Sequence, residues 1–193
     1  GGLDLGDFGR HNGYFARQVS RWTRQWQMSK TREDAHIDRL IAALPGMLPP
    51  EDGLAIVHGD FRIGNVMFHP VAPRVVAILD WELATLGHPL ADLAHCAMTW
   101  DSTPDEYGGI AGLDLDRLGI PDRTTFEARY HALARHGKRL TPVHRAIAFF
   151  RWAVIFEGIA ARARAGTAAD ANAADTGRLS AVFAARAAAL IDA

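Results

Sequence analysis

Two acidic residues and one amide stand where the chain could gather oxygen ligands. Asp60 and Asn65 bracket a tight loop between two short apolar runs, so both side chains can point into one cleft. Asp80 ends a third apolar run, which in a hairpin would return it beside Asn65. Carboxylate and amide oxygens suit Mg²⁺, which keeps several waters and takes its remaining ligands from phosphates. With one carboxylate to spare, the three residues predict both a metal site and a general base.

The segment His58-Gly-Asp-Phe-Arg-Ile-Gly-Asn65 also has a known spacing. Asp60 and Asn65 stand as in the Asp-x-x-x-x-Asn catalytic loop of protein kinases. In that loop the Asp accepts the proton of the substrate hydroxyl and the Asn holds a metal ion. Asp80, within Ile78-Leu-Asp-Trp-Glu82, would then correspond to the metal-binding Asp of the next hairpin.

These segments and Gly87-His-Pro-Leu-Ala-Asp-Leu-Ala94 resemble the aminoglycoside phosphotransferase-like family, in which His-Gly replaces the His-Arg of protein kinases. The resemblance covers essentially the whole chain. Flanking residues such as GYFARQVSRW are most similar to the kinase-like domain found alone or fused to acyl-CoA dehydrogenases. The resemblance implies that residues 1–193 are the C-terminal catalytic lobe of a kinase-like phosphotransferase, with its catalytic loop at 58–65 and its metal-binding segment at 78–82.

The same resemblance implies a role for each central residue. Asp60 would orient and deprotonate an acceptor hydroxyl, while Asn65 and Asp80 would hold Mg²⁺ against the phosphates of ATP. His58 is expected to pack under the loop as a structural residue. Asp92, in the first turn of its helix, is expected to hydrogen-bond the catalytic loop. The implied activity is transfer of the γ-phosphate of ATP to a hydroxyl group of a small molecule, a hydroxyacyl-CoA or an aminoglycoside-like acceptor.

Four further residues are candidates for substrate contacts or for support of the site. Arg62 could contact a phosphate or an acceptor carboxylate, and an ion pair with Glu82 is an equal alternative. Glu82 itself is expected to support the site rather than to bind the metal ion. Trp100 and Tyr107 are acceptor-site candidates, because the Gly- and Pro-rich stretch over 101–121 is long for a plain connection.

The residues that clamp a nucleotide are not found in this sequence. No glycine-rich loop precedes a strand, and neither Lys30 nor Lys138 lies in a strand upstream of the catalytic loop. The resemblance implies that a missing N-terminal kinase lobe, ahead of Gly1, supplies the lysine and the adenine contacts. We expect residues 1–193 alone to bind ATP poorly and to turn over negligibly.

Two other functions stay open. A metallohydrolase could use His58, Asp60, Asp80 and His88 as ligands that activate a water molecule. A noncatalytic binding module of pseudokinase type is the third hypothesis, although the presence of all three oxygen ligands argues against it. Three histidines are expected on loop or helix surfaces and outside any metal site: His69, His88 and His95.

Composition limits the classes of partner. The formal net charge is −1, so no overall positive field favours nucleic acid or an anionic membrane, and neither is expected as a partner. No apolar run reaches membrane-spanning length. The single cysteine, Cys96, excludes an intramolecular disulfide and a cysteine-based zinc cluster, and it suits a reducing cytoplasm.

Hydrophobic periodicity predicts a mainly α chain with a small β-hairpin insertion, the C-terminal lobe of a protein-kinase-like α+β fold. Apolar residues recur at helical spacing over 15–26 and again over 37–44, in a helix expected to begin at Thr31. Three short apolar runs predict strands: 54–57, 65–68 and 75–79. Further helices are predicted from Pro89 to about Trp100, from Asp122 or Thr124 to Gly137, from Thr141 onward, and over 179–190.

Two charged residues interrupt the most apolar of these predicted helices. Arg151 and Glu157 need partners if they are buried, and a structural pair with a neighbouring helix is expected for them. Three tryptophans on apolar stripes are expected in the core: Trp22, Trp26 and Trp152.

Overall fold

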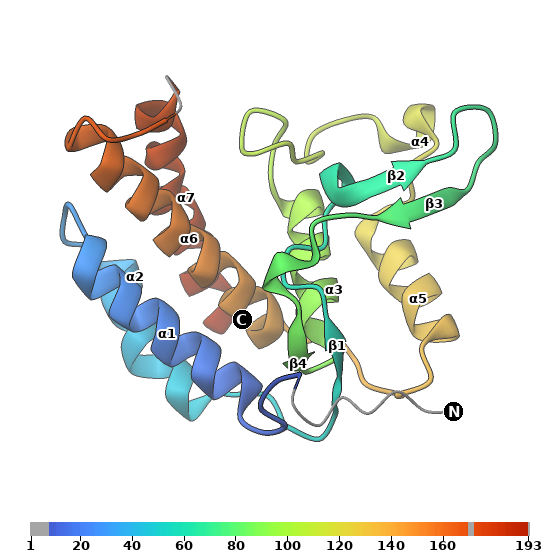
Figure 1. Cartoon of the computed structure of the whole chain (residues 1–193), viewed down its shortest axis with the longest axis horizontal. Helices are drawn as coiled ribbons and strands as arrows, with labels where there is room; N and C mark the ends of the chain where they lie inside the picture. Colours follow the sequence, from blue (N-terminus) through green and yellow to red (C-terminus); the bar gives the residue numbers. More distant parts are fainter. Residues whose placement is uncertain (1–7, 170–171, 193) are drawn as a thin grey trace.

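The computed structural model describes residues 8–169 and 172–192. Helices make up most of the fold, and the short strands lie to one side of the main helical group (Figure 1). Both two-stranded sheets are antiparallel. The expected class, a mainly α chain with a small β part, is therefore confirmed.

The larger part of the fold is a group of four helices, on the left of Figure 1. α6 is its central member and is buried nearly all round, as its apolar sequence predicts. Trp26 and Trp152 are buried in this core, and Trp22 packs against it. The four helices are α1 (Tyr14–Ser29), α2 (Ala35–Ala43), α6 (Pro142–Arg164) and α7 (Ala173–Ile191).

The start of α2 differs from the prediction. Asp34, not Thr31, caps this helix, because its carboxylate accepts hydrogen bonds from the backbone nitrogens of His36 (2.9 Å) and Ile37 (3.2 Å). The hydroxyl of Thr31 donates instead to Glu157, which is distant in sequence. Because the Thr31 side chain is engaged by Glu157, it is not available to cap α2, and Asp34 caps the helix in its place.

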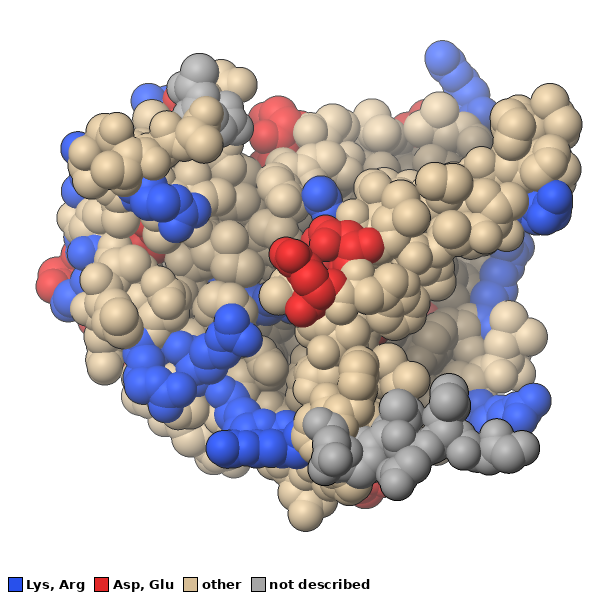
Figure 2. All heavy atoms as spheres, viewed as in Figure 1, with Lys and Arg blue, Asp and Glu red and all other residues tan. Residues whose placement is uncertain are grey.

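Helix α1 has an unusual charge pattern. It contains three arginines and no acidic residue, and Lys and Arg side chains lie over this helix in Figure 2. Its buried residues, which include Phe15, Val19 and Trp26, hold its other face in the core. The arginines therefore lie on the side of α1 that faces away from the core.

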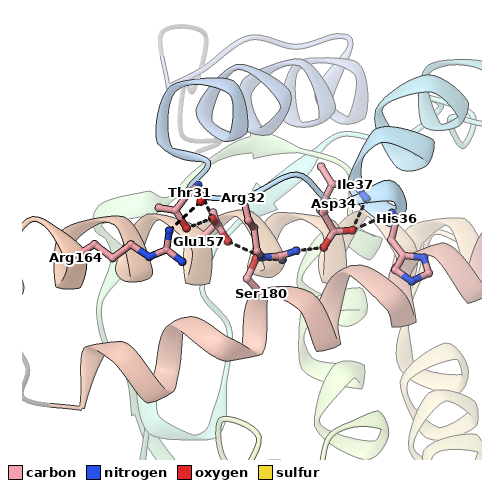
Figure 3. Close-up of polar contacts among 8 residues, drawn as sticks. All are labelled: Thr31, Arg32, Asp34, His36, Ile37, Glu157, Arg164 and Ser180. Carbon is pink, nitrogen blue, oxygen red and sulfur yellow. Dashed lines mark hydrogen bonds and ion pairs between the residues drawn. The ribbon is translucent and has the colours of Figure 1, made fainter.

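A buried carboxylate joins the connection between α1 and α2 to α6 (Figure 3). Glu157 is 1% exposed, and it accepts hydrogen bonds from both the backbone nitrogen and the hydroxyl of Thr31, each at 2.7 Å. The Nε of Arg32 lies 3.4 Å from the same carboxylate, and its Nη2 donates to the hydroxyl of Ser180 on α7 (3.1 Å). Arg164 donates to the carbonyl of Thr31 (2.8 Å). The structural partner expected for Glu157 is thus this connection rather than a helix.

The strands form two separate pairs. β1 (Ala55–Val57) pairs with β4 (Thr85–Gly87), and β2 (Val66–Phe68) pairs with β3 (Val75–Ile78). The three predicted strands are confirmed, and β4 was missed. A Cβ at Gly87 would lie 2.5 Å from the ring of Tyr14, so this glycine lets α1 rest directly against β4.

The remaining helices are short and surround the strands. α3 (Leu90–Ala97) and the 3₁₀ turn η4 (Met98–Asp101) form the helix predicted after Pro89. Asp122 caps α5, which ends before the predicted Gly137. The other elements are α4 (Leu115–Leu118), α5 (Arg123–Leu133), and the 3₁₀ turns η1 (Leu44–Gly46), η2 (Ile63–Asn65) and η3 (Trp81–Leu83). None of the helices in the described part of the chain has the length and apolar character needed to cross a bilayer.

Candidate active site

The loop that follows β1 brings Asp60 and Asn65 together. The side-chain nitrogen of Asn65 donates to the backbone oxygen of Asp60 (2.9 Å) and to its carboxylate Oδ2 (3.0 Å). Asn65 is buried, whereas the Asp60 side chain is 18% exposed. Because the amide nitrogen is used towards Asp60, the amide oxygen is the atom that Asn65 can offer to a cation.

The carboxylate of Asp92 holds the loop from below. It accepts hydrogen bonds from the backbone nitrogens of His58 (2.7 Å) and Gly59 (2.9 Å), as predicted from its place in the first turn of α3. Gly59 has φ +86°, and a Cβ there would meet the backbone oxygen of Leu83 at 2.7 Å. Burial raises the pKa of the Asp92 carboxyl, and its two backbone hydrogen bonds act in the opposite direction.

His58 connects the loop to the end of β3. Its Nε2 donates to the backbone oxygen of Leu79 (2.8 Å), and its Nδ1 accepts from the backbone nitrogen of Asp60 (3.2 Å). The ring also packs on Trp81, with 4.7 Å between centroids. Both ring nitrogens are used inside the protein, so His58 positions the loop, in the structural role expected for it.

Asp80 follows this junction. The backbone nitrogen of Leu79 donates to the backbone oxygen of Asn65 (2.8 Å), which places Asp80 directly after the residue that pairs with Asn65. Asp80 has φ 64° and is exposed. Among the described residues, Asp80 and Tyr107 are the two non-glycine residues with positive φ. Such backbone costs of order 1–3 kcal/mol and collects at functional sites.

The donor set fits a magnesium ion held partly by other ligands. Asn65 offers an amide oxygen and Asp80 a carboxylate, and both are hard oxygen donors. In the described part of the chain, no group of three or more His, Cys, Asp or Glu side chains gathers as a metal site. Asn65 and Asp80 are thus donors of the type that Mg²⁺ accepts beside water and phosphate oxygens.

The metallohydrolase hypothesis requires ligands that the structure does not provide. His58 uses both ring nitrogens within the loop, and His88 is 2% exposed, with its Nδ1 accepting from the backbone nitrogen of Leu90 (3.3 Å). The ring of His88 packs against Phe15 at 5.0 Å. These histidines stabilise the fold and do not converge on Asp60 and Asp80.

The surface positions predicted for His88 and His95 are wrong. His95 is 7% exposed, because its face of α3 packs against α6. Its Nε2 accepts from the indole nitrogen of Trp152 (3.0 Å) and lies 3.7 Å from the Oδ1 of Asp60. His69 is half-buried in a turn, where its Nδ1 accepts from two backbone nitrogens. Sequence reasoning thus missed His95 as a residue that contacts the centre of the site.

Burial lowers the pKa of four histidines, His88, His95, His131 and His144, and two of these shifts are large. Burial lowers the pKa of His95 to about 3, helped by Arg151, and lowers the pKa of His144 to about 4. Since the folded pKa lies below the unfolded value of 6.5, their contribution to stability is present above pH 6.5 and is lost as the pH falls towards the folded values. Chemical denaturation should show the free energy of unfolding falling by about 1.4 kcal/mol per pH unit per histidine between about pH 6 and 5.

His144→Gln provides the matched test of this pH dependence. His144 caps α6 through Thr141, and Gln is itself a capping-box residue, so the helix start should survive. The variant should lose the part of the slope that His144 contributes, up to about 1.4 kcal/mol per pH unit. An unchanged slope in the variant would contradict the assignment of this acid sensitivity to the histidines.

A cavity of about 170 Å³ adjoins the catalytic loop and includes Arg62 and Tyr107 in its lining. The Nε of Arg62 lies 3.5 Å from the Oδ2 of Asp60, and its guanidinium lies 5.4 Å from the centre of the Tyr107 ring. Arg62 thus pairs with Asp60 and not with Glu82. The Tyr107 ring packs on Trp152 at 4.6 Å, so both candidates border the space beside Asp60.

Trp100 lies outside this cavity. Its ring stacks on Phe126 of α5 at 4.5 Å, and its indole nitrogen donates to the backbone oxygen of Pro121 (2.9 Å). Trp100 therefore fixes the end of the 101–121 segment to α5, a structural role. Glu82, in η3, is exposed and lines a second pocket that also includes arginines.

Arg151 is a further residue of the site whose place the sequence did not indicate. It projects from α6, its guanidinium lies 5.6 Å from the centre of the Trp22 ring, and its Nε is buried without a hydrogen-bond partner. Burial lowers the pKa of Arg151, whereas Tyr14 and the carboxylate of Asp60 act to raise it. The interrupted apolar run was the only sequence signal for this residue.

The catalytic loop holds Asp60 against Asn65, and Asp92 of α3 braces it. The loop joins a hairpin that is followed by a second aspartate, Asp80. These features together define a kinase-like phosphotransferase. The comparisons agree. The profile of the phosphotransferase enzyme family matches residues 2–117, more than half of the chain, and the chain belongs to this family. The expected kinase-like fold is confirmed by a solved Ralstonia eutropha structure, of a protein provisionally named an aminoglycoside phosphotransferase. It aligns with a TM-score of 0.91 at 42% identity over 98% of this chain and 58% of that one.

Curated relatives carry the same domain within longer chains. Acyl-CoA dehydrogenase family member 10 of Mus musculus is 37% identical over 183 residues, which cover 91% of this chain and 17% of the relative. Acyl-CoA dehydrogenase family member 11 of Gallus gallus is 37% identical over 174 residues, 86% of this chain and 22% of the relative. The predicted resemblance to the kinase-like domain associated with acyl-CoA dehydrogenases is therefore confirmed.

Proposed function

We propose that this chain is the catalytic lobe of a small-molecule kinase that transfers the γ-phosphate of ATP to an alcohol. The observation that carries the proposal is the hydrogen bond from the Asn65 amide to the Asp60 carboxylate, beside the hairpin that presents Asp80. This arrangement separates a base from two metal ligands within one short loop and hairpin. Phosphoryl transfer needs this combination, because positioning and charge neutralisation supply most of its catalysis.

In this proposal, each residue acts through the contacts described above. Asp60 accepts the proton of the acceptor hydroxyl, and the Asn65 amide fixes the carboxylate orientation. Asn65 and Asp80 would hold Mg²⁺, which would supply charge neutralisation for the transferred phosphoryl group. Asp92 and His58 keep the loop in place from α3 and β3.

The remaining nucleotide contacts are proposed to come from a lobe N-terminal to residue 1. The two lysines contact other parts of the fold, Lys30 through Glu33 and Lys138 through Asp52, each at 2.7 Å. The solved relative is longer than this chain, which covers 58% of it. For the acceptor, the names of the relatives suggest either a hydroxyacyl-CoA or an aminoglycoside-like alcohol.

A coupled assay for ADP release tests the proposed function. The longest natural form of the protein that contains this chain is incubated with ATP, Mg²⁺ and single alcohols, including hydroxyacyl thioesters, hydroxy acids and aminosugars. We expect ADP release that requires both Mg²⁺ and one class of alcohol. Folded protein that binds Mg²⁺·ATP but releases no ADP with any alcohol would overturn the proposal and favour a noncatalytic module.

A further inference from the structure

A group of arginines lies beside the catalytic loop, apart from the residues assigned to the chemistry. Arg17 and Arg21 on α1 and Arg151 on α6 line a pocket of about 300 Å³. Gly59 of the catalytic loop and Glu82 of η3 line the same pocket. The pocket therefore reaches the residue next to Asp60, where the acceptor hydroxyl is proposed to react.

The three guanidinium groups have no acidic partner among the residues that the structure describes. None of them forms an ion pair in the described part of the chain. Arg21 and Arg151 lie against the Trp22 ring, at 5.1 Å and 5.6 Å from its centre, and Arg17 donates to the backbone oxygen of Arg10 (3.1 Å). Within residues 8–169 and 172–192, positive charge is thus concentrated in one pocket without an ion pair to these three arginines.

The placement of Arg17 and Arg21 works against the helix that carries them. They stand four residues apart and so share one face of α1, where like charges repel. No acidic residue in α1 offsets this repulsion. Arg17 contacts a backbone oxygen and Arg21 contacts the Trp22 ring, but neither contact offsets the like-charge repulsion, and a local conflict of this kind is typical of a functional site.

The acidic residues nearby do not cancel the pocket's charge. Glu82 is the one acidic residue in its lining, against three arginines. Asp60 and Asp92 act on the pKa of Arg151 and lie on the catalytic-loop side. In Figure 2 the Lys and Arg side chains over α1 lie beside a smaller group of Asp and Glu side chains near the centre of the view. The α1 side of the pocket therefore stays positive.

We propose that this pocket binds an anionic group, a phosphate or a carboxylate, that belongs to the hydroxyl acceptor. Arginine suits this task because its planar guanidinium forms paired hydrogen bonds with phosphate and carboxylate oxygens. An acceptor with its anion between Arg17, Arg21 and Arg151 would place a nearby hydroxyl at Asp60. The inference rests on the proposed function and narrows it, since a polycationic aminosugar would meet like charge here.

Anion binding to the chain without nucleotide tests the pocket directly. Inorganic pyrophosphate and succinate serve as phosphate and carboxylate probes, and isothermal titration calorimetry gives the Kd of each at low salt. Arg17→Gln and Arg21→Gln should each weaken the preferred probe about threefold to fivefold, and the double variant should weaken it about tenfold or more. Rising salt should weaken binding to the wild type more than to the double variant.

Arg24→Gln is the matched control. Arg24 lies on the same helix and carries the same charge, but it does not line the pocket, and it donates to the hydroxyl of Ser20 (3.1 Å). Its replacement should leave Kd unchanged. An equal loss of affinity in Arg24→Gln, no saturable binding of either probe, or full competition by Mg²⁺·ADP would each overturn the assignment to the acceptor.

Kinetics separate this inference from the proposed function. In the active enzyme, the double variant should raise KM about tenfold for an anionic hydroxy acid while kcat and the KM for glycerol stay within twofold. An unchanged KM for the hydroxy acid would overturn the pocket assignment. Pyrophosphate binding that is lost in the double variant, in a protein that releases no ADP, would support the anion pocket and remove the kinase proposal.

Discussion

Replacement of Asp60 by asparagine is expected to lower kcat for phosphoryl transfer by about 10²–10⁴-fold, because an amide cannot accept the proton of the acceptor hydroxyl. The substitution keeps the shape of the side chain. Its carbonyl oxygen can still accept the hydrogen bond that Asn65 now gives to Oδ2 (3.0 Å). The fold should therefore survive. Steady-state ADP release and thermal unfolding of the same preparations measure the two effects.

The control for this experiment is Asp175→Asn. Asp175 is an exposed residue on α7 that pairs with Arg178 (3.3 Å), far in sequence from the catalytic loop. It makes the same chemical change, so kcat should stay at the wild-type value, and the unfolding temperature should fall by no more than the small loss of a first-turn carboxylate. A wild-type kcat in Asp60→Asn would show that Asp60 is not the base. If Asp60→Asn does not fold, kcat is measured in Asp60→Glu instead.

Local chemistry explains why the catalytic loop could be predicted from the sequence. The partners of Asp60 lie within a few residues of it, since Asn65 follows on the same loop and His58 precedes it. The role of Asp92 came from the resemblance to the phosphotransferase family, and its carboxylate indeed accepts from the backbone nitrogens of His58 and Gly59. Long apolar stripes likewise predicted α1 and α6, where periodicity extends over several turns.

Features that depend on distant partners could not be predicted in the same way. β4 is only three residues long, and its identity as a strand comes from β1, which precedes it by almost thirty positions. The side of α3 that faces inward depends on α6, so the burial of His95 against Trp152 was invisible in the segment around it. The choice between two caps for α2 likewise depended on Glu157, since this residue binds Thr31.

The two arginine assignments show the same limit. The sequence offered Glu82 as a partner for Arg62, but the structure places Arg62 nearer to Asp60, two positions away. Arg151 was expected to form a structural pair with a neighbouring helix, and it does contact α1, through the Trp22 ring, while it also lines a pocket. Charge type alone did not distinguish a structural ion pair from an unpaired binding group. That distinction needed the spatial arrangement of α1, α6 and the catalytic loop.

Replacement of Glu157 by alanine is expected to lower the free energy of unfolding by about 3 kcal/mol, the lower end of the range for breaking a buried ion pair. The carboxylate is 1% exposed and accepts two hydrogen bonds from Thr31 at 2.7 Å. Its loss leaves the backbone nitrogen and hydroxyl of Thr31 without an acceptor. Arg32 keeps partial access to water and its contacts with Asp34 and Ser180, which limits the cost. Urea unfolding measures the change.

Two variants locate the origin of that loss. Glu157→Gln keeps one oxygen acceptor for Thr31 but removes the charge near Arg32, so it should lose less stability than the alanine variant. Glu33→Gln removes an exposed carboxylate from the same connection, where Lys30 is its partner, and it should have no measurable effect. If Glu157→Ala unfolds at the same urea concentration as Glu33→Gln, the network does not join α6 to the α1–α2 connection. A large loss confined to Glu157→Ala would show that this buried carboxylate holds together the two helices that carry the arginines of the anion pocket.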